Sequence, residues 1–67
     1  MGFASELTVI LKDDERTLKT KFLSHDIYSV DPKDPFIKEC IDICVNEFIQ
    51  TPEHEFDIKI RINMVIQ

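Results

Sequence analysis

The C-terminal segment of the chain, EFDIKIRINMVIQ, alternates between two kinds of side chain. One side of the alternation is apolar and the other is polar or charged: Phe56, Ile58, Ile60, Ile62, Met64 and Ile66 against Asp57, Lys59, Arg61 and Asn63. A period of two predicts a β-strand with one face buried and the other in water. The chain therefore contains a sheet, and that sheet carries cations on its open side although the net charge is −5.

Two further strands are predicted near the N-terminus. Residues 7–12, LTVILK, alternate weakly, and residues 16–24 alternate again with Leu18, Thr20 and Phe22 on the inner side. The polar run DDE at 13–15 separates them and has no glycine or asparagine for a tight primed turn. A hairpin with a loop of three to five residues around a type I turn is expected.

One helix is predicted between the hairpin and the last strand. Asp34 followed by Pro35 is a strong start signal, because the carboxylate accepts from free N–H groups of the first turn and proline suits the first helical position. The helix should run from Pro35 to about Gln50 and end before Pro52. We therefore expect a single α+β domain over residues 1–67, with 1–5 flexible: a ββαβ chain, a three-stranded antiparallel sheet in order 2-1-3, and the helix on one face.

Composition narrows the classes of function. A pI near 4.8 disfavours direct nucleic-acid binding. No run of 18 apolar residues indicates a membrane span, and MGFASEL lacks the features of a signal peptide. With only two cysteines there is no disulfide framework, so we expect a cytoplasmic protein, in the host cell if it is viral.

Catalytic and metal motifs are not recognisable. Ser24, His25 and Asp26 are neighbours in sequence, whereas a catalytic triad is assembled in space. Cys40 and Cys44 lie one helical turn apart, but no further ligands have metal-site spacing, so buried thiols are the better interpretation. The sequence predicts a protein that is not an enzyme and has no cofactor.

The predicted helix is apolar over about twice the usual arc. Phe36, Cys40 and Ile43 widen the apolar stripe on one side. Either the loop at 25–33 folds over this excess, or the excess is a dimer interface or a groove for a partner. The last strand also exceeds the usual length, so we expect residues 64–67 to overhang and pair with another subunit. The predicted interface comprises Phe36, Cys40, Ile43 and Val65.

The cations collect on the sheet face away from the helix: Lys12, Lys19, Lys21, Lys59 and Arg61. In one interpretation this is an ordinary solvated face whose lysines discourage edge pairing. In the other, Lys19, Lys21, Lys59 and Arg61 bind an anion, such as a cyclic nucleotide immune signal, in a pocket between subunits. The face lacks aromatic residues for stacking on bases, which argues against RNA.

The segment LTVILKDD at 7–14, the element order, the small size and the acidity resemble the short acidic uracil-DNA glycosylase inhibitors of Bacillus phages. The resemblance implies a non-catalytic homodimer that blocks a host DNA-repair or defence protein. On this hypothesis the partner is bound through the acidic loop side, with the residues Asp26, Tyr28, Asp31 and Asp34. The basic sheet face departs from pure DNA mimicry, and a structural subunit of a larger assembly is a third hypothesis.

Overall fold

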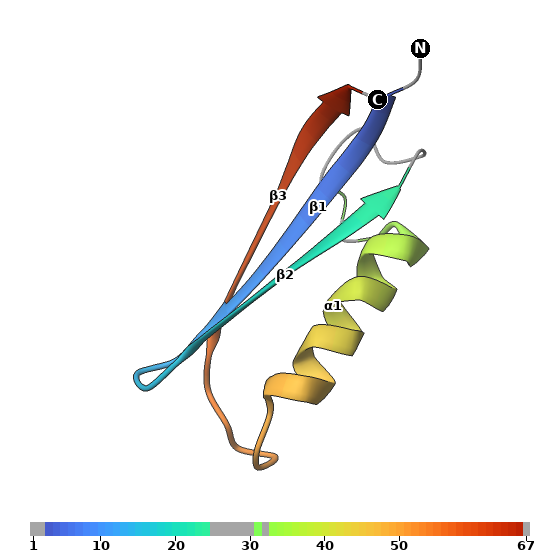
Figure 1. The fold of residues 1–67 in the computed structure, drawn as a ribbon. Coiled ribbons are helices and arrows are strands. Elements are labelled where there is room, and N and C mark those ends of the chain that lie inside the picture. The colour runs from blue at the N-terminus through green and yellow to red at the C-terminus, as the bar shows by residue number, and fades with distance from the viewer. Residues whose placement is uncertain (1–2, 25–30, 32, 67) are drawn as a thin grey trace.

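In the computed structural model the chain forms β1 (Phe3–Lys12), β2 (Thr17–Ser24), α1 (Pro35–Phe48) and β3 (Asp57–Ile66) (Figure 1). The structure describes residues 3–24, 31 and 33–66. The strands form one antiparallel sheet in the order β2-β1-β3, and α1 lies against one of its faces. The predicted α+β fold and strand order are confirmed.

The hairpin between β1 and β2 is closed by a carboxylate. Asp13 donates its backbone N–H to the carbonyl of Arg16 at 3.0 Å. Its Oδ1 accepts from the backbone N–H groups of Glu15 and Arg16, at 2.8 Å each. An aspartate side chain can imitate a backbone turn in this way, which explains how the loop forms without glycine. The four-residue loop lies within the predicted length.

The helix begins where the sequence indicates. Asp34 is the N-cap in an extended conformation, and its Oδ1 accepts from the N–H groups of Phe36 at 2.9 Å and Ile37 at 3.4 Å. Pro35 occupies the first turn, where a missing N–H has no consequence. Ile49 donates its N–H to the carbonyl of Val45 as the C-cap, so α1 ends two residues before the predicted Gln50.

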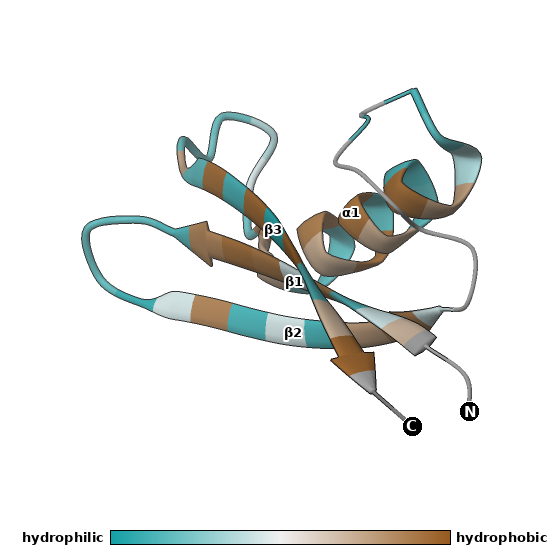
Figure 2. Ribbon diagram, turned by 90° about the horizontal axis from the view of Figure 1, so that it is seen from above, coloured by the Kyte–Doolittle hydropathy of each residue, from teal (hydrophilic) through white to brown (hydrophobic). Residues whose placement is uncertain are grey.

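The core lies between β1 and α1. It comprises residues that are at most 2 % exposed: Leu7, Val9 and Leu11 from β1 with Ile37, Cys40, Cys44 and Phe48 from α1. Figure 2 shows apolar and polar residues alternating along β2 and β3, whereas the end of β1, in the middle of the sheet, is continuously apolar. Cys40 therefore faces the sheet, whereas the sequence placed it on the additional apolar side of the helix with Phe36 and Ile43.

β1 is longer at its N-terminus than the sequence pattern predicts. It begins at Phe3, which pairs with Ile66, so β3 is paired along its whole length. The predicted overhang at the end of β3 is wrong for residues 64–66. Residues 3–5, for which we expected flexibility, form the first part of β1, with Ala4 and Ser5 buried.

α1 lies off-centre on the sheet. Within the described part of the chain it packs on β1 and β2, and β3 extends beyond it. Two side chains on the α1 side of β3 remain open to solvent, Ile58 at 46 % and Met64 at 53 % exposure. The molecule is elongated, 44 × 21 × 15 Å, because two ten-residue strands set its length.

Candidate binding surfaces

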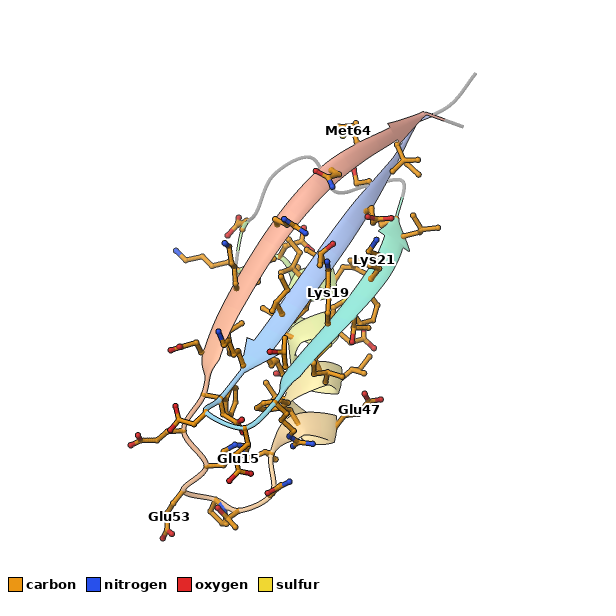
Figure 3. The ribbon with its side chains drawn as sticks, turned by 60° about the vertical axis from the view of Figure 1, so that its left-hand side comes forward. Glu15, Lys19, Lys21, Glu47, Glu53 and Met64 are labelled. Atoms are coloured by element: carbon orange, nitrogen blue, oxygen red, sulfur yellow. The ribbon has the colours of Figure 1, made fainter. Side chains whose placement is uncertain are left out.

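The face of the sheet that is turned away from α1 is basic. Leu7, Val9 and Leu11 pack against α1, so the alternate residues of β1 and their cross-strand partners occupy the other face. We call this surface the basic face and define it by its cations: Lys12, Lys19, Lys21, Lys59 and Arg61. Figure 3 views the sheet from this side, with Lys19 and Lys21 on β2 in front of the sheet and α1 behind it.

The cations form a regular grid because the strand register aligns them. Lys21 and Arg61 lie on either side of Thr8, and Lys19 and Lys59 lie on either side of Ile10. Neighbouring strands are about 5 Å apart, so the Cα atoms of each flanking pair are separated by about 10 Å. Thr8 is only 1 % exposed although no helix or second sheet covers it. We attribute this burial to the aliphatic stems of the flanking long side chains.

Few carboxylates oppose these cations. Among the chain's 13 acidic residues, those that the structure places on the basic face are Glu6 and Asp57. Lys21 Nζ lies 3.8 Å from Glu6 Oε1, but the lysine side chain is 58 % exposed, so this pair contributes little stability. In the part of the chain that is described, the other four cations of the basic face form no ion pair. The negative net charge is therefore distributed away from this surface.

Of the acidic residues predicted to bind a partner, the structure describes Asp31 and Asp34. Asp31 accepts the backbone N–H of Lys33 at 2.9 Å, and Asp34 caps α1. Both carboxylates accept hydrogen bonds from backbone N–H groups close to them in the sequence. Asp26 and Tyr28 lie outside the described residues.

The residues predicted to form an oligomer interface do not share one surface. Phe36 and Ile43 are exposed on α1, at 36 % and 45 %. Cys40 is 2 % exposed in the core. Val65 is half-buried opposite Ala4, in the row of β3 that faces away from α1. An interface with α1 at its centre would therefore leave Val65 on the other side of the sheet.

A second structured site lies where the hairpin loop meets the connection between α1 and β3. The imidazole of His54 stacks on the Phe48 ring with centroids 5.2 Å apart, and Phe56 meets both rings edge to face. Arg16 places its guanidinium 4.3 Å from the Phe48 ring centroid and donates to the Phe48 carbonyl. His54 Nε2 lies 2.6 Å from Asp13 Oδ2. We call these five residues the His54 cluster.

The hydrogen bonds of the His54 cluster suit one tautomer of the neutral imidazole. The backbone N–H of Gln50 can only donate, so His54 Nδ1, at 3.3 Å, is the acceptor. The proton is then on Nε2, which donates to Asp13. Both ring nitrogens are therefore used inside the protein, whereas an acid–base catalyst needs one directed at its substrate. The His54 cluster therefore joins the hairpin loop to the end of α1 and to the segment before β3.

The His54 cluster is not predicted from the sequence, in which His54 is isolated and Asp13 belongs to a polar run expected to form a solvent-exposed turn. The Asp13 side chain is only 12 % exposed. A signal was available in the predicted strand order, since β1 and β3 are neighbours and Lys12 pairs with Asp57. This pairing brings the residues just after β1 next to those just before β3.

The surface depressions at this end of the molecule are acidic. One depression, of about 620 Å³, is lined by Lys12, Asp13, Asp14, Glu55, Phe56 and Asp57. Four carboxylates against one lysine would repel an anion, so this depression does not suit an anionic ligand.

The cysteines have the properties of core residues. Cys40 and Cys44 are free and buried. Burial, with smaller contributions from the neighbouring Cys44 and Glu39, raises the pKa of the Cys40 thiol. A raised pKa disfavours the reactive thiolate. No cluster of three or more potential metal ligands occurs among the described residues.

Comparisons with known proteins give no match: no family model fits the chain, and no curated protein or solved structure is similar to it. In the region that the structure describes, no helix has the length and apolar character needed to cross a membrane.

Proposed function

We propose that this protein is a non-catalytic binding protein whose basic face captures an acidic surface of a partner protein. The observation that carries the proposal is the strand register, which collects five cations on one face of a chain with net charge −5. Four of them have no ion-pair partner within the described residues. These four cations are therefore free to pair with carboxylates of a partner protein.

The shape and chemistry of the basic face favour a protein over other anions. Small ligands bind in concave sites that bury most of their surface, and the open side of a three-stranded sheet is a surface of a different kind. Single-stranded nucleic acids are bound by stacking on aromatic rings, and the described positions of this face carry no aromatic residue. An acidic protein surface can bind to a flat basic face without a cavity and without stacking on aromatic rings.

The polarised charge suggests how recognition would proceed. A positive face on an otherwise negative molecule orients an approaching acidic partner and speeds association at low salt. The half-buried Ile10, between Lys19 and Lys59, supplies an apolar centre within the rim of cations. This combination of a drier centre and a charged rim is usual for protein interfaces.

The inhibitor function implied by the phage resemblance is one form that this capture would take. In that case the basic face, rather than Asp31 and Asp34, would contact the host protein, because both carboxylates already hold local backbone groups. Sequestration of a small anionic nucleotide is the alternative that the experiment must separate.

The test uses neutral substitutions on β2, far from the other edge of the sheet. The variant K19Q/K21Q removes two charges from the basic face, and K33Q/K38Q removes two exposed charges elsewhere while giving the same net charge. A fluorescent polyglutamate peptide is titrated with each protein at low and high salt, with a single-stranded oligonucleotide and a cyclic dinucleotide as further probes.

We expect the peptide to bind wild type and K33Q/K38Q with similar, salt-sensitive affinity and K19Q/K21Q about tenfold more weakly, as the loss of two charge contacts implies. Equal weakening in both double variants would mean that only net charge matters and would contradict the proposal. Tighter binding of the cyclic dinucleotide than of the peptide would contradict a protein partner and would indicate a small anionic ligand.

A further inference from the structure

The four central cations of the basic face form two columns, one on each side of β1. Lys19 and Lys21 lie on β2, and Lys59 and Arg61 lie on β3. Residues two apart in a strand are separated by about 7 Å, so each column presents two charges at this spacing. The two columns are about 10 Å apart, because two strand spacings separate them. A ligand that meets all four cations therefore carries its anionic groups in two rows.

The strip between the two columns has an apolar centre. Ile10, on β1 between Lys19 and Lys59, is half-buried and faces this side of the sheet. Val9, Ile10 and Leu11 make β1 continuously apolar here, and such runs are typical of strands that are covered on both faces. The α1 side of β1 is already covered, at Val9 and Leu11. The pattern therefore indicates that a further element covers the side of Ile10.

Two kinds of protein segment can supply rows of carboxylates, and their geometry separates them. An extended strand places alternate side chains about 7 Å apart in a single row, so it reaches one column only. Its backbone N–H and C=O groups would also lack hydrogen-bond partners on a face made of side chains. An α-helix satisfies its own backbone and is about 10 Å wide, which matches the separation of the columns. Its residues i and i+4 are about 6 Å apart along the axis, close to the spacing within a column.

We propose that the basic face binds an acidic amphipathic α-helix of its partner, which lies along β1 with one row of carboxylates over each column. This inference rests on the proposed function and names the segment that the partner supplies. At about 100° per residue, the pattern ExELExE places the glutamates at i and i+4 on one flank of the helix and those at i+2 and i+6 on the other. The leucine at i+3 then lies midway between the flanks and faces Ile10.

Two carboxylates of the basic face limit the length of the acidic segment. Glu6 lies beyond one end of the two columns, and Asp57, two residues before Lys59, lies beyond the other end. A longer acidic run would meet these like charges, which repel it. Leu23, opposite Glu6 and 63 % exposed, is an apolar contact for the next turn of the helix. We therefore expect the partner's acidic residues to occupy about two helical turns, with an apolar residue beyond them near Leu23.

Three alanine-based peptides of equal charge test the arrangement. The first carries ExELExE with alanine at x. The second has the same composition with its glutamates on all sides of the helix, and the third replaces one x of the first by proline, which breaks the helix. Fluorescence anisotropy measures the affinity of each labelled peptide for the wild-type protein, and circular dichroism follows the helix content of the peptide on binding. We expect the first peptide to bind about tenfold more tightly than the other two and to gain helix.

The outcomes separate this inference from the proposed function. Equal affinity for the three peptides would overturn the acidic helix. If none of the three binds while polyglutamate does, the acidic helix is again overturned and the proposed function stands. If polyglutamate fails to bind as well, the proposed function fails together with the inference.

Removal of one column at a time tests whether the helix contacts both. K19Q/K21Q removes the column on β2, and K59Q/R61Q removes the column on β3; all four positions are exposed. The first peptide should bind each of these variants about tenfold more weakly than wild type. The control double variant on α1 and the loop before it, which has the same net charge, should bind like wild type. Full affinity in either column variant would place the ligand on a single column and would overturn the inference.

Discussion

At the residue scale, Asp13 links the hairpin loop to the segment before β3. Its carboxylate accepts from two backbone N–H groups of its own loop and from His54, which stacks on Phe48 at the end of α1. The hydrogen bonds from Glu15 and Arg16, with a smaller contribution from His54, lower the pKa of Asp13 from 3.8 to about 2, although burial opposes the shift. The charged form of Asp13 therefore stabilises the folded state.

This shift predicts how stability depends on pH. Because the pKa is lower in the folded than in the unfolded chain, the stabilisation is present above 3.8 and is lost as the pH falls towards 2. We expect Asp13→Asn to be less stable than wild type at neutral pH and to lose less stability than wild type through this window. Asp14→Asn, at an exposed position, is the control and should follow wild type. Thermal melts at a series of pH values measure this, and equal slopes for wild type and Asp13→Asn would contradict it.

At the element scale, the sequence predicts those features whose signals are local. The Asp34-Pro35 cap and the short hairpin loop after Lys12 are each indicated by adjacent residues, and both occur in the structure. The start of β1 was missed because residues 3–6, FASE, do not alternate, and they form a strand through pairing with β3. Cys40 was misplaced because helical periodicity gives the width of an apolar stripe, while the position of α1 on the sheet decides which part is buried.

The cap of α1 permits a prediction of magnitude. Asp34→Ala leaves the first-turn N–H groups of Phe36 and Ile37 without their acceptor, and the loss of such a cap costs about 1 kcal/mol of unfolding free energy. Asp42→Ala, at an exposed position inside α1, is the matched control and should change stability by less than about 0.5 kcal/mol. Urea denaturation of both variants measures the difference. An equal effect in the two would show that Asp34 does not act as a cap.

At the scale of the whole molecule, charge and apolar surface are separated by the fold. The cations lie on one face of the sheet and α1 packs on the other face. Because α1 is off-centre, it leaves the β3 edge open. The alternation in the last strand and the predicted strand order were sufficient to locate the basic face. The off-centre position of α1 and the His54 cluster were not predicted, because both depend on side chains that meet only after the chain has folded.

The central claim, that the basic face is the binding surface, is tested most directly by mapping a contact residue by residue. Two-dimensional ¹⁵N–¹H NMR spectra are recorded while unlabelled polyglutamate peptide is added to labelled protein. We predict salt-sensitive shift changes centred on Thr8, Ile10, Lys19 and Lys21, with the exposed side of α1 around Asp42 unchanged. Changes centred on α1 or on the His54 cluster, with the basic face unaffected, would contradict the claim.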